Sequence, residues 1–234
     1  TVWAEDATSE AMLERIRMSQ KIDVLEAGDI ISLPTQVFRG FENIGEDVGY
    51  LFAILGGDDP GKVLWAPYVF DMAKEYGLVL LEDGTLVDIA AGETVPADKK
   101  IMPETTPEQV AALKPFTTSD LRACCIKAGE VVPLTQTDGI KTRALISQSS
   151  KLNWSHGFHV TQYELETGSM TEMSDFHNSD VVYVFDGDLS IEVNDMTYSM
   201  HSGDTATISK GSMRRFHNIS ERPVTFLRVQ GNDA

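Results

Sequence analysis

The chain has 234 residues, of which 42% are hydrophobic, enough for one large or two small folded domains and too many for a disordered protein. Its formal net charge is −17, which argues against nucleic acids and anionic membrane surfaces as partners, because both select clustered lysine and arginine. No apolar run reaches the roughly 20 residues needed to span a bilayer, and the first residues lack the basic and apolar pattern of a secretory signal.

The first part of the chain predicts short strands and one clear helix. Residues 1–20 favour a helix, or alternatively the frayed end of a strand pair, and residues 21–55 favour β-structure. Within the latter, residues 48–55 are rich in aromatic and branched side chains, which predicts a buried strand. A helix over 68–76 and a hairpin over 78–88 follow, the hairpin turning at an Asp-Gly pair.

The second part predicts a linker followed by a β-domain. Residues 89–126 are rich in alanine, proline and charge, with a capped helical turn at 106–113 and a short helix from Thr118 or Ser119 to Cys125. From residue 127 onward, short strands separated by turns run to Gly231, which indicates a closed barrel or a jelly roll.

The two cysteines, Cys124 and Cys125, are adjacent in the sequence. Neighbouring cysteines rarely form a disulfide with each other, because the geometry is strained. They also lack the C-x-x-C spacing of a redox or metal site. We therefore expect buried thiols in a cytoplasmic protein.

One stretch of the chain occurs twice. Residues 28–43 and 203–218 share glycine, aspartate, arginine, phenylalanine and asparagine, and each matching pair is 175 positions apart. Each copy reads as a turn, a strand, a second turn and a second strand. Such a repeat predicts two related β-domains.

Both copies resemble the second signature of the cupin family, in which glycine, P-x-G, histidine and asparagine follow one another at fixed spacing. In this chain the signature asparagine is Asn43 in the first copy and Asn218 in the second. The resemblance implies an all-β fold of tandem cupin jelly-roll barrels. Its parts are a partial N-terminal cupin domain (1–88), a linker with short helices (89–126) and a C-terminal cupin domain (127–234). The N-terminal copy lacks room for the first signature, and one candidate to complete that barrel is a second subunit, so we expect a homodimer.

The metal ligands that the resemblance implies are mostly absent. The position of the third histidine is Arg39 in one copy and Arg214 in the other. In the first signature of the C-terminal copy, Asp180 stands at the glutamate position, and His177 lies one residue out of register. The two histidine positions hold Phe176 and Ser174 or, with the longer spacer, Asp175 and Met173. On a strand, one residue is the difference between facing inward and facing outward. We therefore expect no tightly held metal.

A metal site remains an alternative. His177, Asp180 and His217 have suitable side chains for iron or manganese if a register shift or bulge brings them together. His156 and His159 are further candidates from an earlier strand.

An inward-facing arginine needs an anionic partner, because an unpaired buried charge is costly. Arg214 either anchors an acidic small molecule or pairs internally, for example with Asp180, and Arg39 either does likewise or pairs between the barrels. Four aromatic residues are candidate walls of the ligand site: Tyr163, Tyr183, Phe158 and Phe226.

Together these features predict a protein that binds a small anionic organic molecule. Any chemistry would be metal-independent acid–base or isomerase chemistry, with Asp180 and His177 as catalytic groups. Two alternatives stay open: a metal-dependent dioxygenase or other oxidoreductase, and a non-catalytic structural or sensory protein. We expect no nucleic acid or membrane partner.

Overall fold

The structure is a computed structural model, and it describes residues 2–5, 23–56, 63–113, 117–130 and 135–231. The chain forms two compact units. Unit 1 comprises Thr1–Leu25, Leu33–Leu51 and Pro60–Arg122, and unit 2 comprises Glu26–Ser32, Phe52–Asp59 and Ala123–Ala234. The expected boundaries after residues 88 and 126 stay a prediction, but two segments of the expected N-terminal domain belong with the C-terminal strands.

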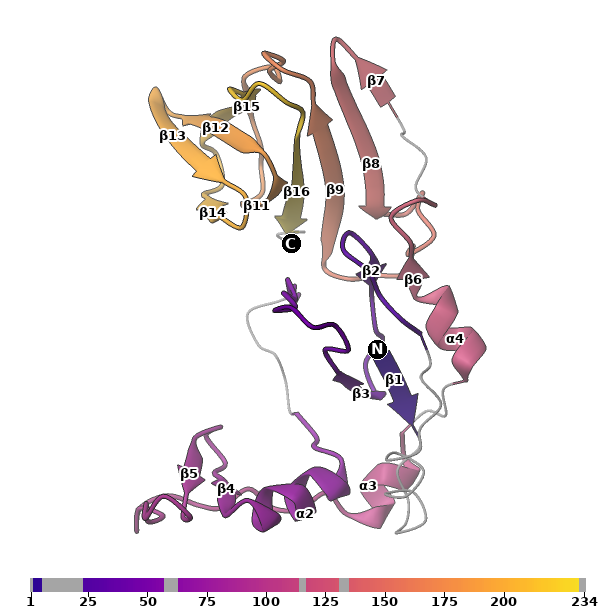
Figure 1. Ribbon diagram of the computed structural model, residues 1–234, viewed down its shortest axis with the longest axis vertical. Helices are drawn as coiled ribbons and strands as arrows, with labels where there is room; N and C mark the ends of the chain where they lie inside the picture. Colours follow the sequence, from indigo (N-terminus) through magenta and orange to yellow (C-terminus); the bar gives the residue numbers. More distant parts are fainter. Residues whose placement is uncertain (1, 6–22, 57–62, 114–116, 131–134, 232–234) are drawn as a thin grey trace. The chain divides into compact units, whose positions relative to one another are not determined.

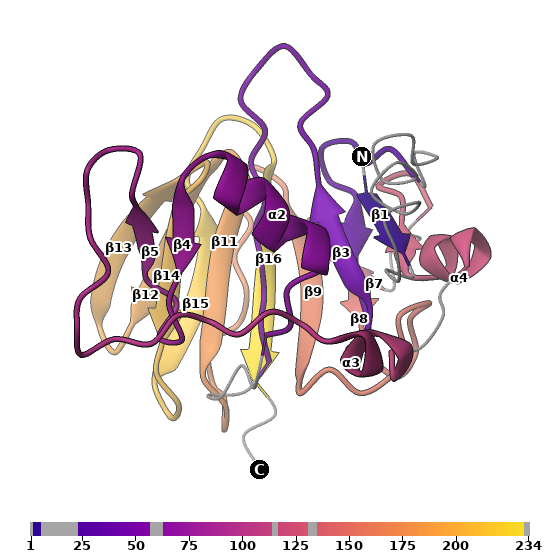
Figure 2. The same cartoon turned by 90° about the horizontal axis from the view of Figure 1, so that it is seen from below.

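Unit 2 is built from two antiparallel sheets (Figures 1 and 2). The six-stranded sheet has the order β14-β11-β16-β9-β8-β7, and the four-stranded sheet has the order β10-β15-β12-β13. The strands are β7 (Thr135–Thr137), β8 (Ile140–Ile146), β9 (Phe158–Leu165), β10 (Ser174–Asp175), β11 (Asp180–Asp186), β12 (Asp188–Val193), β13 (Met196–His201), β14 (Thr205–Ile208), β15 (Met213–Asn218) and β16 (Val224–Gly231). From β9 to β12 and from β13 to β16, consecutive strands alternate between the two sheets. This is the strand order of a jelly roll, and the predicted fold class is confirmed.

Both faces of the six-stranded sheet are buried. Alternate side chains, such as Val182, Val184 and Phe226, pack into the core between the sheets. Side chains of the opposite face, such as Val160 and Val229, form a second cluster. That cluster is covered by residues from early in the chain, namely Ile30, Phe52 and Ile54.

Strand β2 (Ile30–Ile31) pairs antiparallel with β6 (Cys125–Ile126), which fixes one of these early segments in unit 2. Cys124 and Cys125 are both buried, as predicted.

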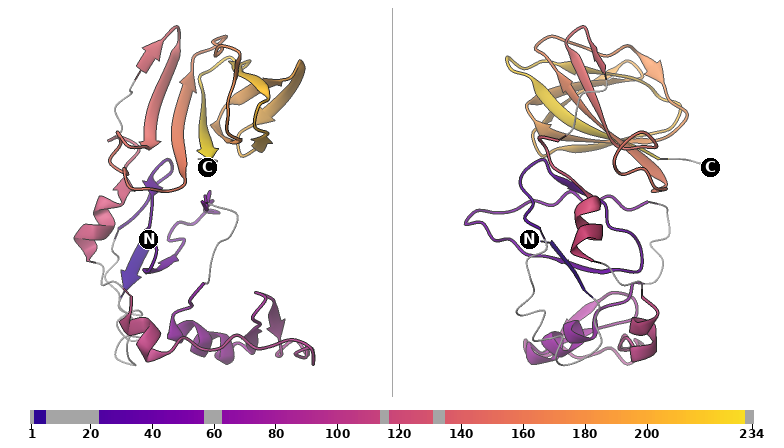
Figure 3. Two further views of the ribbon diagram at one scale, coloured as in Figure 1. Left: turned by 180° about the vertical axis from the view of Figure 1, so that it is seen from behind. Right: turned by 90° about the vertical axis from the view of Figure 1, so that its right-hand side faces the viewer.

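Unit 1 contains short strands and helices. They are β1 (Val2–Glu5), β3 (Phe38–Phe41), α2 (Pro67–Glu75), β4 (Leu78–Leu80), β5 (Leu86–Asp88), α3 (Pro107–Ala111) and α4 (Thr118–Ala123), the last of which ends at the unit boundary (Figure 3). The helix after Pro67, the hairpin of β4 and β5, and the two short helices are confirmed. Thr106 and Gln109 form a capping box at the start of α3. Residues 2–5 form β1, which pairs with β3, as the alternative of a strand pair predicts. Residues 6–20, over which the helix was expected, lie outside the described part of the chain.

The predicted buried strand over 48–55 is wrong. These residues form no strand, and Val48, Tyr50 and Leu55 are 76%, 90% and 74% exposed. Only Phe52 and Ile54 pack on the outer cluster of unit 2. A strand requires a neighbouring backbone, and apolar composition alone does not supply one.

The two copies of the repeat build the same turns. The Oδ2 atoms of Asp29 and Asp204 each accept a hydrogen bond from the backbone N–H three residues earlier, at 2.9 and 2.8 Å. The Nδ2 groups of Asn43 and Asn218 each donate to the carbonyl four residues later, at 2.7 and 2.8 Å. The strands between the turns differ, because β15 pairs with β10 and β12 whereas β3 pairs with β1 alone among the described strands.

Candidate functional site

A cluster of three charged side chains lies at one end of the interior of the jelly roll. Asp180 begins β11, Arg228 comes from β16 in the same sheet, and Arg214 comes from β15 in the facing sheet. The side chains of Asp180 and Arg214 are 0% exposed, and that of Arg228 is 4% exposed. The alternation of each strand places them inward beside the apolar core.

One carboxylate oxygen serves both arginines. Arg214 Nε donates to Asp180 Oδ2 at 2.7 Å, and Arg228 Nε donates to the same oxygen at 2.9 Å. The internal ion pair, one of the two accounts given of Arg214 from the sequence, is therefore confirmed. The cluster carries two positive charges and one negative charge.

The two guanidinium groups differ in how fully they are bonded. Arg214 also donates to three backbone carbonyls, those of Asn178 (2.9 Å), Ser212 (3.0 Å) and Ser209 (3.4 Å). Nη2 of Arg228 lies 2.7 Å from Asp180 Oδ2 but is not aligned for a hydrogen bond, so it has no acceptor among the described residues.

Asp180 and Phe176 complete the surroundings of the two guanidinium groups. Asp180 Oδ1 likewise has no donor in the described part of the chain. The ring of Phe176 stacks against both cations, 3.7 Å from the Arg228 Cζ and 4.7 Å from the Arg214 Cζ. The ring face is electron-rich and favours a cation, but it neutralises no charge.

The polar end of the interior includes three more side chains. In the strand register, Gln230 lies directly opposite Asp180 on β11 and directly opposite His159 on β9. Thr161 of β9 lies directly opposite Arg228. Directly opposite residues of an antiparallel pair lie on the same face, so these side chains point inward. All three are partly exposed. The deeper interior is filled by aromatic rings, since Tyr163 and Phe216 each lie 5.0 Å from Phe226.

Not all of the predicted walls of the ligand site lie in the interior. Tyr163 and Phe226 do. Tyr183 does not, because its ring stacks on Phe52 at 4.5 Å on the opposite face of the sheet, and Phe158 packs with the same outer cluster. For these two residues the prediction is wrong, because alternation along β9 and β11 directs them outward.

The other predicted residues are also dispersed. His177 is exposed, and its neighbour Phe176 takes the place beside the arginines. Arg39 is exposed, and its guanidinium donates to the carbonyl of Val37 at 3.5 Å. No group of three or more His, Cys, Asp or Glu side chains in the described residues could hold a metal ion, so His177, Asp180 and His217 do not form the alternative site.

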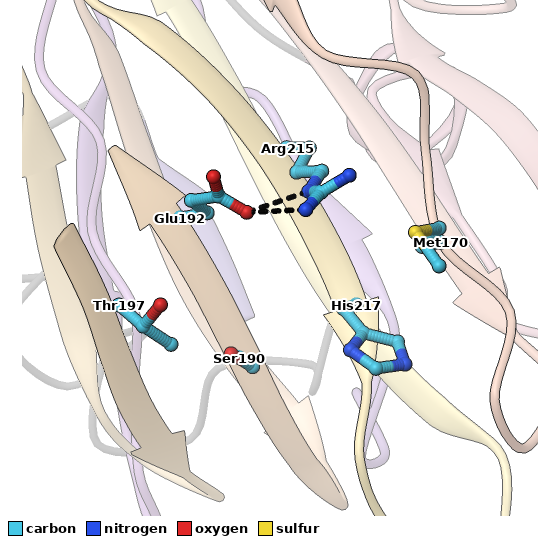
Figure 4. A pocket seen from close by; sticks show the side chains of 6 residues that line it. All are labelled: Met170, Ser190, Glu192, Thr197, Arg215 and His217. Atoms are coloured by element: carbon cyan, nitrogen blue, oxygen red, sulfur yellow. Dashed lines mark hydrogen bonds and ion pairs between the residues drawn. The ribbon is translucent and has the colours of Figure 1, made fainter. Parts of the chain in front are cut away.

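His217 lies on the outer face of the four-stranded sheet, as the alternation predicts. It lines a shallow hollow of about 290 Å³ with Met170, Ser190, Glu192, Thr197 and Arg215 (Figure 4). Arg215 donates to Glu192 Oε2 at 2.7 Å, which neutralises both charges. The hollow therefore offers no charged group free to fix a ligand.

The sequence interpretation missed Arg228, and it named Phe176 only as the residue at a histidine position of the cupin signature. The alternating stretch V-T-F-L-R-V-Q over 224–230 carried a usable signal, because it places Arg228 on the same face as Phe226. The histidine position of the signature marked Phe176, but no local pattern predicted that its ring contacts the two arginines.

Comparisons with known proteins give only distant structural likenesses. No protein-family model matches the chain, and no curated protein matches it. It is similar to a solved structure of a predicted oxalate decarboxylase from Thermotoga maritima, with 16% identity and a TM-score of 0.41 over 45% of this chain and 96% of that one. It is also similar to a cupin-2 domain from Rhodospirillum rubrum, with 13% identity and a TM-score of 0.38 over 44% of this chain and 69% of that one.

A third similar structure is the cupin domain of an XRE family transcriptional regulator from Enterobacter cloacae, with 16% identity and a TM-score of 0.37 over 42% of this chain and all of that one. Likenesses this distant say nothing of activity. The strand order within unit 2 itself defines that unit as a jelly roll. No helix in the described residues is long and apolar enough to cross a membrane.

Proposed function

We propose that unit 2 binds a small anionic organic molecule at the polar end of its interior, with Arg228 as the principal anchor. The observation that carries this proposal is the buried guanidinium of Arg228, whose Nη2 group lacks an acceptor among the described residues in a cluster with one positive charge in excess.

Electrostatics supports an anion there. A buried excess charge is unfavourable unless it is paired, and the two arginines share one carboxylate. A carboxylate or phosphate would supply both the missing charge and the missing acceptor, and the planar guanidinium suits such groups. Arg228 is the better anchor of the two arginines, because Arg214 is already bonded to three carbonyls.

The unmatched oxygen of Asp180 narrows the class of ligand. Its Oδ1 atom can only accept a hydrogen bond while the side chain is ionised. A ligand that carries a hydroxyl beside its acidic group would satisfy both unmatched atoms at once. Hydroxy acids and sugar acids therefore fit the cluster better than simple dicarboxylates do.

The inward face also suggests which group would move a proton. Asp180 Oδ2 already accepts hydrogen bonds from two guanidinium groups, and the expected partner His177 is exposed. His159 shares the inward face with Gln230 and is partly exposed. In the proposed isomerase-type chemistry, His159 is therefore the acid–base group, and Asp180 and Arg228 position the substrate.

The proposal is tested by calorimetric titration of the purified chain with malate, oxalate and inorganic phosphate, each in a separate experiment. We expect malate to bind most tightly, and Arg228→Gln to weaken binding by about 10- to 100-fold, since a hydrogen bond to a charged group contributes about 1.5–3 kcal/mol.

Arg222→Gln is the matched control, because Arg222 is an exposed arginine paired with Asp186 on the surface. It should leave binding unchanged, and circular dichroism checks that both variants are folded. The proposal fails if none of the three anions binds, or if Arg228→Gln binds them as the unaltered chain does.

A further inference from the structure

We propose a second chemical site in unit 2, a nucleophile–base pair formed by Ser32 and His156. The Oγ atom of Ser32 lies 2.6 Å from Nε2 of His156, although 124 positions separate the two residues. Neither residue belongs to the arginine cluster, so the pair is independent of the proposed anion site.

The other ring nitrogen of His156 determines the direction of this hydrogen bond. Nδ1 lies 2.6 Å from the backbone carbonyl oxygen of Trp154. A carbonyl oxygen can only accept, so Nδ1 carries the hydrogen and the Nε2 lone pair is free in the neutral ring. Ser32 therefore donates its hydroxyl hydrogen to Nε2, which is the arrangement of a serine with its general base.

The pair is held in place from both sides. The backbone N–H of Ser32 donates to the carbonyl of Cys124 at 3.0 Å, directly after the pairing of β2 with β6. The imidazole of His156 stacks on Trp154, with ring centroids 4.9 Å apart, and contacts Phe158 at 5.6 Å. A positioned nucleophile and base, with a third group that orients the base, is the pattern of nucleophilic catalysis.

The backbone next to His156 is also closely packed. A Cβ atom added to Gly56 would lie 2.4 Å from the backbone oxygen of His156, so the chain at residue 56 passes directly against it. Both side chains of the pair are nevertheless partly exposed, which leaves the serine hydroxyl accessible to a small molecule.

The pair would support acyl transfer from small uncharged esters. Ser32 Oγ forms a bond to the ester carbonyl carbon while its proton passes to His156 Nε2, and the resulting imidazolium then protonates the alkoxide that leaves. Water, activated by the same nitrogen, next attacks the acyl-serine, which releases the acid and restores the serine hydroxyl. No oxidant, metal or further reactant is needed.

Two features of the surroundings indicate the substrate class. Trp154 and Phe158 adjoin the base and offer an apolar surface to the acyl group. The orienting group is a neutral carbonyl rather than a carboxylate, so it stabilises the imidazolium less than aspartate would. We therefore infer slow turnover of activated apolar esters.

The experiment is covalent labelling of the full chain with an alkyl fluorophosphonate, followed by peptide mass spectrometry. In this reaction Oγ bonds to phosphorus, fluoride leaves, and His156 takes the proton. We expect one adduct on Ser32, absent in Ser32→Ala and formed at least tenfold more slowly in His156→Gln, whose amide can hydrogen-bond but cannot act as the base.

Ser149→Ala is the matched control, since the Oγ of Ser149 lies 3.1 Å from the hydroxyl of Ser147, which cannot serve as a base. It should label as the unaltered chain does. Circular dichroism verifies that each variant is folded, and mapping the adduct in the unaltered chain decides the question if Ser32→Ala does not fold. An unlabelled Ser32, or a labelling rate unchanged in His156→Gln, overturns the proposal.

Discussion

Replacing Asp180 with asparagine would leave two buried guanidinium groups without a counterion. Both arginines direct Nε to the same oxygen, at 2.7 and 2.9 Å, and no other carboxylate of the described residues forms an ion pair with either. Asparagine has nearly the same shape and can still accept through its amide oxygen. The substitution therefore removes the charge with little change in packing.

The expected cost follows from the burial of the cluster. Unit charges about 4 Å apart at an effective dielectric constant of about 20 interact by about 4 kcal/mol. The variant loses two such attractions, keeps the repulsion between the two cations, and retains the carbonyl contacts of Arg214. Breaking a buried ion pair from one side costs about 3–5 kcal/mol. Because whole domains are stable by only about 5–15 kcal/mol, unit 2 should be severely destabilised.

The assay is equilibrium unfolding in urea at neutral pH, monitored by circular dichroism and by tryptophan fluorescence. The control is Asp186→Asn, which removes one carboxylate of an exposed ion pair with Arg222 in the same unit and should change stability little. If Asp180→Asn is no less stable than Asp186→Asn, the arginines do not depend on this carboxylate and the electrostatic reasoning is refuted.

Three other changes have defined outcomes. Burial alone would raise the pKa of Asp29, but hydrogen bonds from two backbone N–H groups and from Lys127 outweigh it and lower that pKa. The ionised carboxylate therefore stabilises the fold above pH about 4, and this contribution is lost as the pH falls through the pKa of Asp29 in the folded state. In urea unfolding, the difference in stability between Asp29→Asn and the unaltered chain should narrow in acid. Gly187→Ala should lower the free energy of unfolding, measured in urea, by about 1–3 kcal/mol and by more than Gly203→Ala does. Both glycines have φ above +90°, but only at Gly187 would the added Cβ lie 3.0 Å from a backbone atom, the Cα of Val224. Thr106→Ala should cost about 1 kcal/mol by removing the cap of α3, and an unchanged thermal midpoint for unit 1 would contradict this.

Local patterns predicted the elements whose causes are local. The helix after Pro67 and the capping box at Thr106 depend on residues within one or two turns, and both appear as expected. The repeat was also recognisable, because each copy builds its turns from side chains that bond to backbone three or four residues away.

Features that depend on distant partners could not be predicted in this way. Residues 48–55 have the composition of a strand, yet they form none, because strand formation requires a neighbour that composition does not specify. Two early segments pack with unit 2 for the same kind of reason, since Ile30 and Phe52 find their apolar partners more than 70 positions away.

The sequence by itself determined the jelly-roll class and the presence of arginine where the cupin signature has histidine. It left open whether Arg214 is free or internally paired. The tertiary structure decided that Asp180 pairs with Arg214, and it added Arg228 and Phe176 to the cluster. It also brought Ser32 to His156. Hydrogen bonds and ion pairs act only over a few ångströms, so the order of residues indicates which groups are available, and the packing of strands decides which of them meet.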